Sequence, residues 1–354
     1  MARARKKILV TGATGFIGSR IVRKLCEAGH EVKLFCRPGS LRGTLAGIPA
    51  GAVEVAEGDI TVGHTIYRAL AGCDRMFHVA ATVKMWSPDP RCILEPAVIG
   101  MREALEAARR RDLDKVVVTS SAVTLGSNPD PEPLDESREG SVDGAEHYAR
   151  AKLESEKIAR SFANEGMPIV IVNPTVVVGP HDVRPSFAGR MLLRYLHWRM
   201  PIGFPCQQGG TNVVDVDDCA EGHVLAMERG AVGQRYILGG ENLTYRQILE
   251  LLAEITGLPG PSFDTPRALA MALGCVLETK ARLFGGEPLV TYRLARDTIG
   301  SFLWVTSHRA ERSLGYRHRS ARRTLMRSVR YYLEHGFVTP TAARRIRLDL
   351  RAIA

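Results

Sequence analysis

The chain has 354 residues, of which 45% are hydrophobic, and a formal net charge of +10 at pH 7. This length can bury a sizeable core, as one large domain or two closely associated domains. No apolar run approaches the roughly 20 residues of a membrane-spanning helix. Glycines at positions 12 and 15 leave the apolar segment after the basic N-terminus too short for a signal peptide. We therefore expect no transmembrane segment.

The cysteines and histidines show no metal-binding or disulfide pattern. The seven cysteines are scattered, odd in number and free of Cys-x-x-Cys pairs, and the histidines lack His-Glu-x-x-His spacing. This usage is typical of reduced thiols in the cytoplasm. We expect a cytoplasmic protein without a bound metal.

The basic residues are concentrated near the C-terminal end. Residues 301–354 contain twelve arginines, no lysine and three acidic residues, a net charge of +9, so the rest of the chain is nearly neutral. We expect this charge to form the solvated face of a helix packed on the body, without nucleic-acid binding. Peripheral contact of this basic tail with an anionic membrane surface is the alternative.

The first predicted element is a buried strand that ends in a glycine-rich turn. An apolar run at residues 8–10 is followed by Gly12, Gly15 and Gly18, and then by a helical pattern of apolar side chains. Gly12 permits a sharp turn of the chain, Gly15 lets the backbone approach a pyrophosphate, and Gly18 lets the helix pack closely on the strand. The N-terminus of the helix then points its N–H groups at the phosphates. A glycine turn without a ligand is the alternative, but the strand–glycine–helix context favours dinucleotide binding.

The remaining chain alternates short β-rich runs with helical patterns, which favours a doubly wound parallel sheet. We predict a Rossmann-type α/β fold with an NADP-binding domain over residues 1–180. A smaller, mostly helical substrate-binding portion follows over 181–336, with some elements returning to the first domain, and then a basic tail over 337–354. The expected strands are 31–36, 52–55, 75–79, 115–121, 168–173 and 235–238; the expected helices are 65–71, 93–111, 145–165, 187–199, one opening within 213–218 and ending at 229, 244–256, much of 264–300, and 320–335.

The end of the second strand selects the cofactor in this architecture, because a carboxylate there binds the ribose 2′-hydroxyl of NAD. This chain has Cys36 and Arg37 instead, and an arginine can pair with the 2′-phosphate of NADP. A solvated surface arginine is the alternative. Asp59, after the third strand, can accept a hydrogen bond from the adenine amino group. We predict that NADP(H) is preferred, with NAD(H) as the alternative.

The fourth predicted strand ends in His-Val-Ala-Ala at residues 78–81. The small side chains of Val79, Ala80 and Ala81 let a cofactor lie against the backbone. We interpret His78 as a packed core residue rather than a catalytic one.

Three residues point to reversible hydride transfer to a carbonyl group. Ser121 ends the fifth predicted strand, and the next helix carries Tyr148 and Lys152, whose i, i+4 spacing puts them on one face. A tyrosine hydroxyl can protonate the alkoxide, and a nearby ammonium favours this by lowering its pKa. Ser121 would hold the carbonyl oxygen. Each feature alone is common in helices or strand ends, but their order after a dinucleotide fold favours catalysis.

Together these motifs resemble an extended short-chain dehydrogenase/reductase over at least residues 6–260. The motifs at residues 96–101, 174–180 and Arg37–Pro38 are similar to the dihydroflavonol reductase and cinnamoyl-CoA reductase branch. The segment from 214–218 through 235–244 resembles bacterial hopanoid-associated sugar epimerases. Ala97, where related sugar epimerases often carry asparagine, favours a reductase, as does the missing acid after the second strand.

The resemblance implies a role for each matched residue. Tyr148 is the acid/base, Lys152 modulates it and binds the cofactor ribose, and Ser121 anchors the carbonyl. The resemblance also implies a homodimer formed through the helices at 93–111 and 145–165. The remaining implied cofactor contacts are Thr14, Phe16 and Ile17 at the pyrophosphate, Arg37 at the 2′-phosphate, Asp59 and Ile60 at adenine, and Pro174 and Val177 at the nicotinamide.

Three functions are consistent with these motifs. The leading one is NADP(H)-dependent reduction of a ketone or aldehyde on a hydrophobic or alicyclic small molecule, with substrate walls from 82–86, 126–147 and 180–300. The second is a nucleotide-sugar 4-epimerase or dehydratase that retains NAD(P). The third is a non-enzymatic cofactor-sensing regulator, which the presence of Tyr148 and Lys152 disfavours.

Overall fold

The computed structural model describes residues 5–40, 45, 47–48, 51–82, 84–142, 145–197, 209–260, 266–288 and 290–348. These residues form a parallel sheet of seven strands in the order β3-β2-β1-β4-β5-β6-β9. The order runs in opposite directions on either side of β1 and β4, which creates the switch point where ligands of such sheets bind. The strands are β1 (Lys7–Thr11), β2 (Glu31–Cys36), β3 (Val53–Glu57), β4 (Arg75–His78), β5 (Lys115–Thr119), β6 (Ile169–Pro174) and β9 (Arg235–Leu238).

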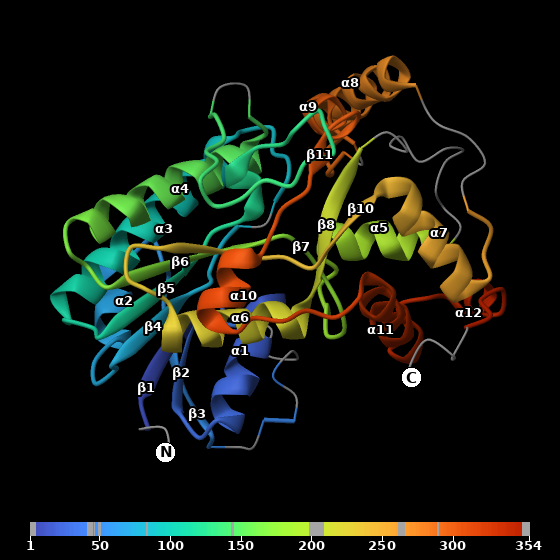
Figure 1. Ribbon diagram of the computed structural model, residues 1–354. Helices are drawn as coiled ribbons and strands as arrows, with labels where there is room; N and C mark the ends of the chain where they lie inside the picture. The colour runs from blue at the N-terminus through green and yellow to red at the C-terminus, as the bar shows by residue number, and fades with distance from the viewer. Residues whose placement is uncertain are drawn as a thin grey trace.

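Helices cover both faces of this sheet (Figure 1). One hydrophobic core lies between the sheet and α1 (Phe16–Glu27), α6 (Val216–Arg229) and α10 (His308–Leu314). A second core lies on the opposite face, against α2 (Gly63–Ala69), α3 (Arg91–Arg110) and α4 (His147–Asn164). The central strands are buried on both sides, which explains their continuous apolar runs. The predicted Rossmann-type architecture is confirmed.

A smaller part follows β6 and contains a second sheet and a third core. In this sheet β8 pairs with three short strands, and the third core lies among helices of the second half of the chain. The elements of this smaller part are β7 (Val176–Val178), α5 (Phe187–Leu196), β8 (Gly210–Asp215), β10 (Glu241–Thr244), α7 (Tyr245–Thr256), α8 (Arg267–Phe284), α9 (Tyr292–Thr298), β11 (Phe302–Leu303), α11 (Ala321–Glu334) and α12 (Pro340–Ala343). A 3₁₀ helix, Ala122–Leu125, follows β5 and belongs to the larger part.

This second sheet is the main difference from the sequence prediction. Its strands have two to six residues, and every residue of β8 is buried, so no alternating pattern marks it. The apolar residues before Asp217 belong to β8, and the helix expected within 213–218 begins at Val216. The helix predicted from residue 244 is confirmed, with Thr244 as its N-cap in a capping box with Gln247.

Two arginines near the C-terminal end, Arg319 and Arg327, pair with acids at the start of α6. The Arg319 Nη1 atom lies 3.0 Å from Asp215 Oδ1 and 2.6 Å from Asp218 Oδ1. The guanidinium of Arg327 contacts Asp215 and, at 2.5 Å, Asp217. In α11 the apolar side of the helix is buried, as predicted. These two arginines therefore hold α11 against the body.

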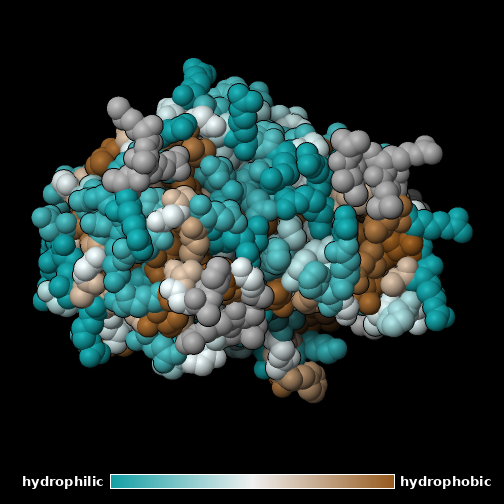
Figure 2. All heavy atoms as spheres, turned by 90° about the horizontal axis from the view of Figure 1, so that it is seen from below, coloured by the Kyte–Doolittle hydropathy of each residue, from teal (hydrophilic) through white to brown (hydrophobic). Residues whose placement is uncertain are grey.

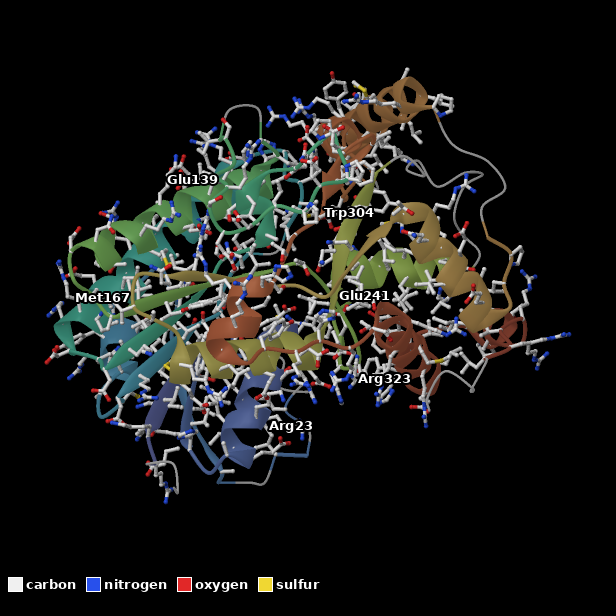
Figure 3. The ribbon with its side chains drawn as sticks, viewed as in Figure 1. Arg23, Glu139, Met167, Glu241, Trp304 and Arg323 are labelled. Atoms are coloured by element: carbon white, nitrogen blue, oxygen red, sulfur yellow. The ribbon has the colours of Figure 1, made fainter. Side chains whose placement is uncertain are left out.

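Further contacts hold the elements of the smaller part together. The Ala321 backbone N–H, at the start of α11, donates to Glu241 Oε2 of β10 at 2.9 Å (Figure 3). Trp304 donates from Nε1 to the Leu243 carbonyl at 3.2 Å. Hydrophilic side chains cover most of the face seen from below, with smaller hydrophobic patches between them (Figure 2). None of the helices in the described ranges combines the length and apolar character that crossing a bilayer requires.

Candidate active site

The glycine-rich turn after β1 packs directly against the end of β4. Gly12 has a φ of 67°, and a Cβ atom there would lie 2.7 Å from the backbone N of Ala80. A Cβ at Gly18 would lie 2.1 Å from the Gly12 carbonyl oxygen. The Thr11 hydroxyl accepts hydrogen bonds from the backbone N–H groups of Val79 and Ala80, both at 3.1 Å. Glycine is thus required at positions 12 and 18 by close backbone approach.

The N-terminus of α1 is open at the same sheet edge. Its N-cap, Gly15, provides no side-chain cap, so the first-turn N–H groups stay available for an anion. Phe16 and Ile17 begin the helix and are partly exposed, and Thr14 lies in the turn before it. A small-residue cradle and an uncapped helix start fit the pyrophosphate of a dinucleotide.

The residues predicted to hold the adenosine end follow β2 and β3. Arg37 is exposed directly after β2, and its charge contributes to a lowered pKa at Asp59. The larger causes of that lowered pKa are hydrogen bonds to Asp59 Oδ1 from the Thr61 hydroxyl at 2.7 Å and backbone N–H at 2.9 Å. The Asp59 carboxylate is therefore already engaged within its own loop, and Ile60 is half-buried beside it.

The predicted catalytic residues come together beyond β5. Ser121 is nearly buried after this strand, and α4 brings Tyr148 to it. Burial raises the pKa of the Tyr148 hydroxyl, and a hydrogen bond with the Ser121 side chain opposes that rise. The described protein groups alone therefore do not produce the expected fall in the tyrosine pKa. They keep Tyr148 protonated, which suits a proton donor.

Lys152 lies one turn further along α4 and is buried. Its Nζ atom donates a hydrogen bond to the Thr119 carbonyl oxygen at 3.0 Å. Burial lowers the pKa of Lys152 to about 8, against the opposing charge of Glu156. The ammonium is thus mostly protonated at neutral pH and is fixed to the end of β5.

Behind these residues, the buried carboxylate of Glu156 connects three elements. Glu156 Oε2 accepts hydrogen bonds from the Ser120 hydroxyl, from Thr124 Oγ1 at 2.9 Å and from Asn173 Nδ2 at 2.8 Å. Glu156 Oε1 pairs with Arg235 Nη1 at 2.8 Å, and both side chains are 5% exposed. Sequence reasoning did not find this pair, which joins residues of α4 and β9. The network fixes the strand end that carries Ser121.

Arg235 also holds the loop between β5 and α4. Its Nε atom donates to the Glu136 carbonyl at 2.8 Å, and its Nη2 atom donates to the Arg138 carbonyl. The Glu136 side chain in turn accepts a hydrogen bond from the Ile237 backbone N–H at 3.0 Å. One buried guanidinium therefore links this loop to the sheet.

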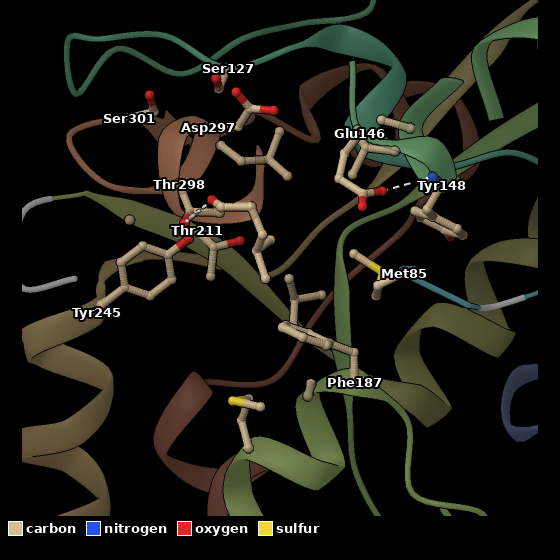
Figure 4. A pocket seen from close by; sticks show the side chains of 18 of the residues that line it. Met85, Ser127, Glu146, Tyr148, Phe187, Thr211, Tyr245, Asp297, Thr298 and Ser301 are labelled. Carbon is tan, nitrogen blue, oxygen red and sulfur yellow. Dashed lines mark hydrogen bonds between the residues drawn. The ribbon is translucent and has the colours of Figure 1, made fainter. Parts of the chain in front are cut away.

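Glu146 is a second residue that sequence reasoning missed. It is the N-cap of α4, where its Oε2 atom accepts a hydrogen bond from the Tyr148 backbone N–H at 2.9 Å (Figure 4). Burial raises the pKa of Glu146 to about 7. Glutamate is not among the residues that N-cap positions prefer, so no local pattern in the sequence indicated this role.

A large apolar cavity opens beside Tyr148. It has a volume of about 470 Å³, and most of its lining is aliphatic or aromatic. Figure 4 shows Met85, Phe187 and Tyr245 around it, with Tyr148 and Glu146 at one side. The lining draws on the three segments expected as substrate walls, although residues 83, 143–144, 198–208, 261–265 and 289 lie outside the described ranges.

The other residues predicted to contact the cofactor lie at or after the carboxyl ends of β4 and β6. Pro174 ends β6 and Val177 is in β7, so both follow the carboxyl end of β6. Val79 and Ala80 are half-buried and Ala81 is exposed after β4. His78 is buried, with Nδ1 at 3.1 Å from the Thr11 hydroxyl, and burial lowers its pKa to about 3. It is therefore a neutral core residue, as predicted.

Comparison with known proteins identifies the family. The model of the NAD dependent epimerase/dehydratase family matches residues 8–239. The chain belongs to this family. It is 34% identical over 336 residues to a putative dihydroflavonol 4-reductase from Synechocystis sp., covering 93% of this chain and 95% of that protein. It is also 34% identical over 332 residues to sterol demethylase protein B from Methylococcus capsulatus, covering 93% and 99%.

Solved structures of the NAD dependent epimerase/dehydratase fold superpose over nearly the whole chain. The crystal structure of gox2253 has a TM-score of 0.83 and 35% identity, covering 95% of this chain and all of that one. PA4631, a nucleoside-diphosphate-sugar epimerase from Pseudomonas aeruginosa, has a TM-score of 0.77 and 25% identity with the same coverage. The predicted resemblance to extended short-chain dehydrogenases/reductases is confirmed. The chain is an enzyme of a family that includes reductases, epimerases and dehydratases.

Proposed function

We propose that the protein reduces a ketone or aldehyde on an apolar small molecule, using NADPH. The observation that supports this best is the position of Tyr148, which lies beside the Ser121 side chain and lines an apolar cavity of about 470 Å³. Two of its relatives carry the names putative dihydroflavonol 4-reductase and cinnamoyl-CoA reductase 1.

The bound cofactor would be held by the glycine turn, the start of α1 and Arg37, and would supply the hydride. Ser121 orients the substrate carbonyl by donating a hydrogen bond to its oxygen. The carbonyl carbon gains the hydride, and its oxygen takes the proton of the Tyr148 hydroxyl. The Lys152 ammonium favours the phenolate that remains, because an opposite charge stabilises it. Solvent then returns a proton to Tyr148.

The preference for NADPH rests on the end of β2. Arg37 is exposed there and its planar guanidinium can pair with a phosphate. Cys36 stands where an NAD-specific site would carry a carboxylate. Asp59 does not stand at this position, because it follows β3, where its Oδ1 atom accepts hydrogen bonds from Thr61.

The second candidate is a nucleotide-sugar epimerase or dehydratase, which the likeness to PA4631 favours. Such a substrate carries a diphosphate that needs cationic partners. Arg296 is the one cationic side chain among the described residues lining the cavity, and its Nε atom already lies 2.6 Å from Asp297 Oδ1. This lining favours an uncharged substrate.

A binding titration of NADPH against NADH, followed by a screen of apolar ketones and aldehydes with the preferred cofactor, tests the proposal. We expect tighter binding of NADPH and net NADPH consumption with at least one apolar carbonyl compound. Co-purification of tightly held NAD, together with conversion of a nucleotide sugar and no net NADPH consumption, would support the epimerase instead.

A further inference from the structure

Helix α8 exposes an unusual amount of apolar surface. Ten large hydrophobic side chains are exposed in the described parts of the chain, and six of them lie between residues 269 and 292. Leu283 and Phe284, at the end of the helix, are 72% and 80% exposed. The full set in this segment is Leu269, Leu273, Val276, Leu283, Phe284 and Tyr292. Such clustering marks an interaction surface, whereas isolated exposed side chains do not.

The exposed apolar residues of α8 form one stripe along the helix. Their spacing of three, four and seven residues places Leu269, Leu273, Val276, Leu283 and Phe284 on one side at 100° per residue. We call these five residues the α8 stripe. A different side faces the protein, where Ala270, Gly274 and Ala281 are buried.

The contact with the body is made by small residues. A Cβ atom at Gly274 would lie 2.7 Å from the Tyr292 backbone N, so α8 packs closely on the start of α9. Figure 1 shows α8 beside α9 at the upper end of the molecule, away from the parallel sheet. The α8 stripe therefore has no role in holding the helix to the protein.

The charge within the α8 stripe favours an anionic occupant. Lys280 lies within the stripe by its spacing, whereas Arg267 and Arg282 lie on the opposite side of the helix, where Arg267 Nη2 donates to the Arg296 carbonyl at 2.9 Å. Glu278 is the one acid of α8, and its carboxylate accepts a hydrogen bond from the Tyr292 backbone N–H at 2.6 Å. Anionic phospholipid headgroups would neutralise the Lys280 ammonium, whereas a second copy packed stripe to stripe would bury this charge against apolar side chains. A lysine within an apolar stripe can place its ammonium among headgroups while its methylenes stay in the apolar layer.

The helix next to α8 forms part of the cavity wall. Leu294, Asp297 and Thr298 of α9 line the cavity, and Ala270 of α8 belongs to the same small core as Ala295 of α9 and Ile299 just after it. A surface that rests on α8 would thus lie next to the wall of the apolar cavity.

We propose that the α8 stripe docks the protein on the surface of an anionic phospholipid membrane, from which it takes an apolar substrate. The docking does not depend on hydride chemistry; only the use of the membrane as a substrate source rests on the proposed function. The helix lies in the interface, with its apolar side chains below the headgroups and the Lys280 ammonium among them. The α8 stripe, rather than the basic C-terminal tail, is then the membrane contact.

Co-sedimentation of the full chain with vesicles tests the docking without cofactor or substrate. We expect binding to phosphatidylcholine vesicles that contain phosphatidylglycerol, and weaker binding to phosphatidylcholine alone. The double variant Leu283→Ser/Phe284→Ser removes two side chains that would enter the membrane, and each loss should weaken vesicle binding about tenfold. Lys280→Glu should weaken binding only to the anionic vesicles, and added salt should have the same effect.

Val232→Ser is the matched control, because Val232 is 50% exposed on the loop before β9, outside α8. It should bind vesicles like the wild type, and thermal unfolding should show that all variants fold. Absent vesicle binding, or equal binding by the double variant and the control, would overturn the proposal. So would a wild-type dimer that the double variant converts to a monomer, because the stripe would then cover a second copy. Turnover of a water-soluble ketone tests the hydride chemistry separately.

Discussion

The Glu146 carboxylate and the Tyr148 backbone are joined by a hydrogen bond of 2.9 Å at the first turn of α4. The residue that starts the catalytic helix is thus itself a buried acid at the edge of the substrate cavity. Its surroundings include Arg293 and Asp297 of α9, Glu278 of α8 and its neighbour His147. Burial raises the pKa of Glu146, and the negative charges of Asp297 and Glu278 add to that rise. Together they outweigh the Tyr148 backbone N–H and Arg293 and favour the uncharged form of Glu146.

Glu146→Gln should change how stability depends on pH. The folded protein holds a proton on Glu146 up to about pH 7, whereas the unfolded chain releases it near the usual value of 4.5. The stabilising effect of this proton is therefore complete below pH 4.5 and is lost as the pH rises to 7. Relative to Glu146→Gln, the wild-type free energy of unfolding should fall by about 3 kcal/mol over this range. Urea unfolding at several pH values measures it, and a constant difference would contradict the assignment.

Arg37→Asp should reverse the cofactor preference. Loss of the guanidinium removes a charge-assisted pair with the 2′-phosphate of NADPH. The new carboxylate repels that phosphate, and it can accept a hydrogen bond from the ribose 2′-hydroxyl of NADH. We expect NADPH binding to weaken about 10- to 100-fold, while NADH binding is unchanged or improved. Fluorescence titration measures both. Arg68→Asp, at an exposed arginine near the end of α2, is the control for net charge; equal effects of the two variants would show that Arg37 makes no specific contact.

Arg235→Met should unfold the protein more easily. It leaves the buried Glu156 carboxylate with only the more distant cation of Arg160, whose Nε atom lies 3.8 Å away, and this costs up to about 3–5 kcal/mol. It also frees the loop that Arg235 holds through the Glu136 carbonyl. Urea unfolding should show that adding Glu156→Gln recovers part of the loss, because no buried charge then remains. If the double variant were no more stable than the single one, charge burial would not be the cause.

The sequence predicts the parts of the fold that depend on local patterns. The glycine turn predicts the close packing seen at Gly12 and Gly18, and the bounds of β2 and β9 agree with the expected residues. The apolar spacing of α11 predicts its buried side, and Thr244 predicts the start of α7.

The features that sequence reasoning missed depend on contacts between distant residues. β8 is recognisable only through its pairing with β7 and β10, and Arg235 meets Glu156 across 79 positions of the chain. The raised pKa of Glu146 likewise depends on packing of α4 against distant segments. A single sequence shows neither such pairings nor the degree of burial they create.

The central claim is that Tyr148 donates the proton that completes carbonyl reduction. Its most direct test compares NADPH consumption and NADPH binding in wild type and Tyr148→Phe, with Tyr292→Phe as the control at an exposed tyrosine. We predict that Tyr148→Phe lowers turnover of an apolar ketone at least about a hundredfold while NADPH binding is unchanged. Wild-type turnover in Tyr148→Phe would contradict the account.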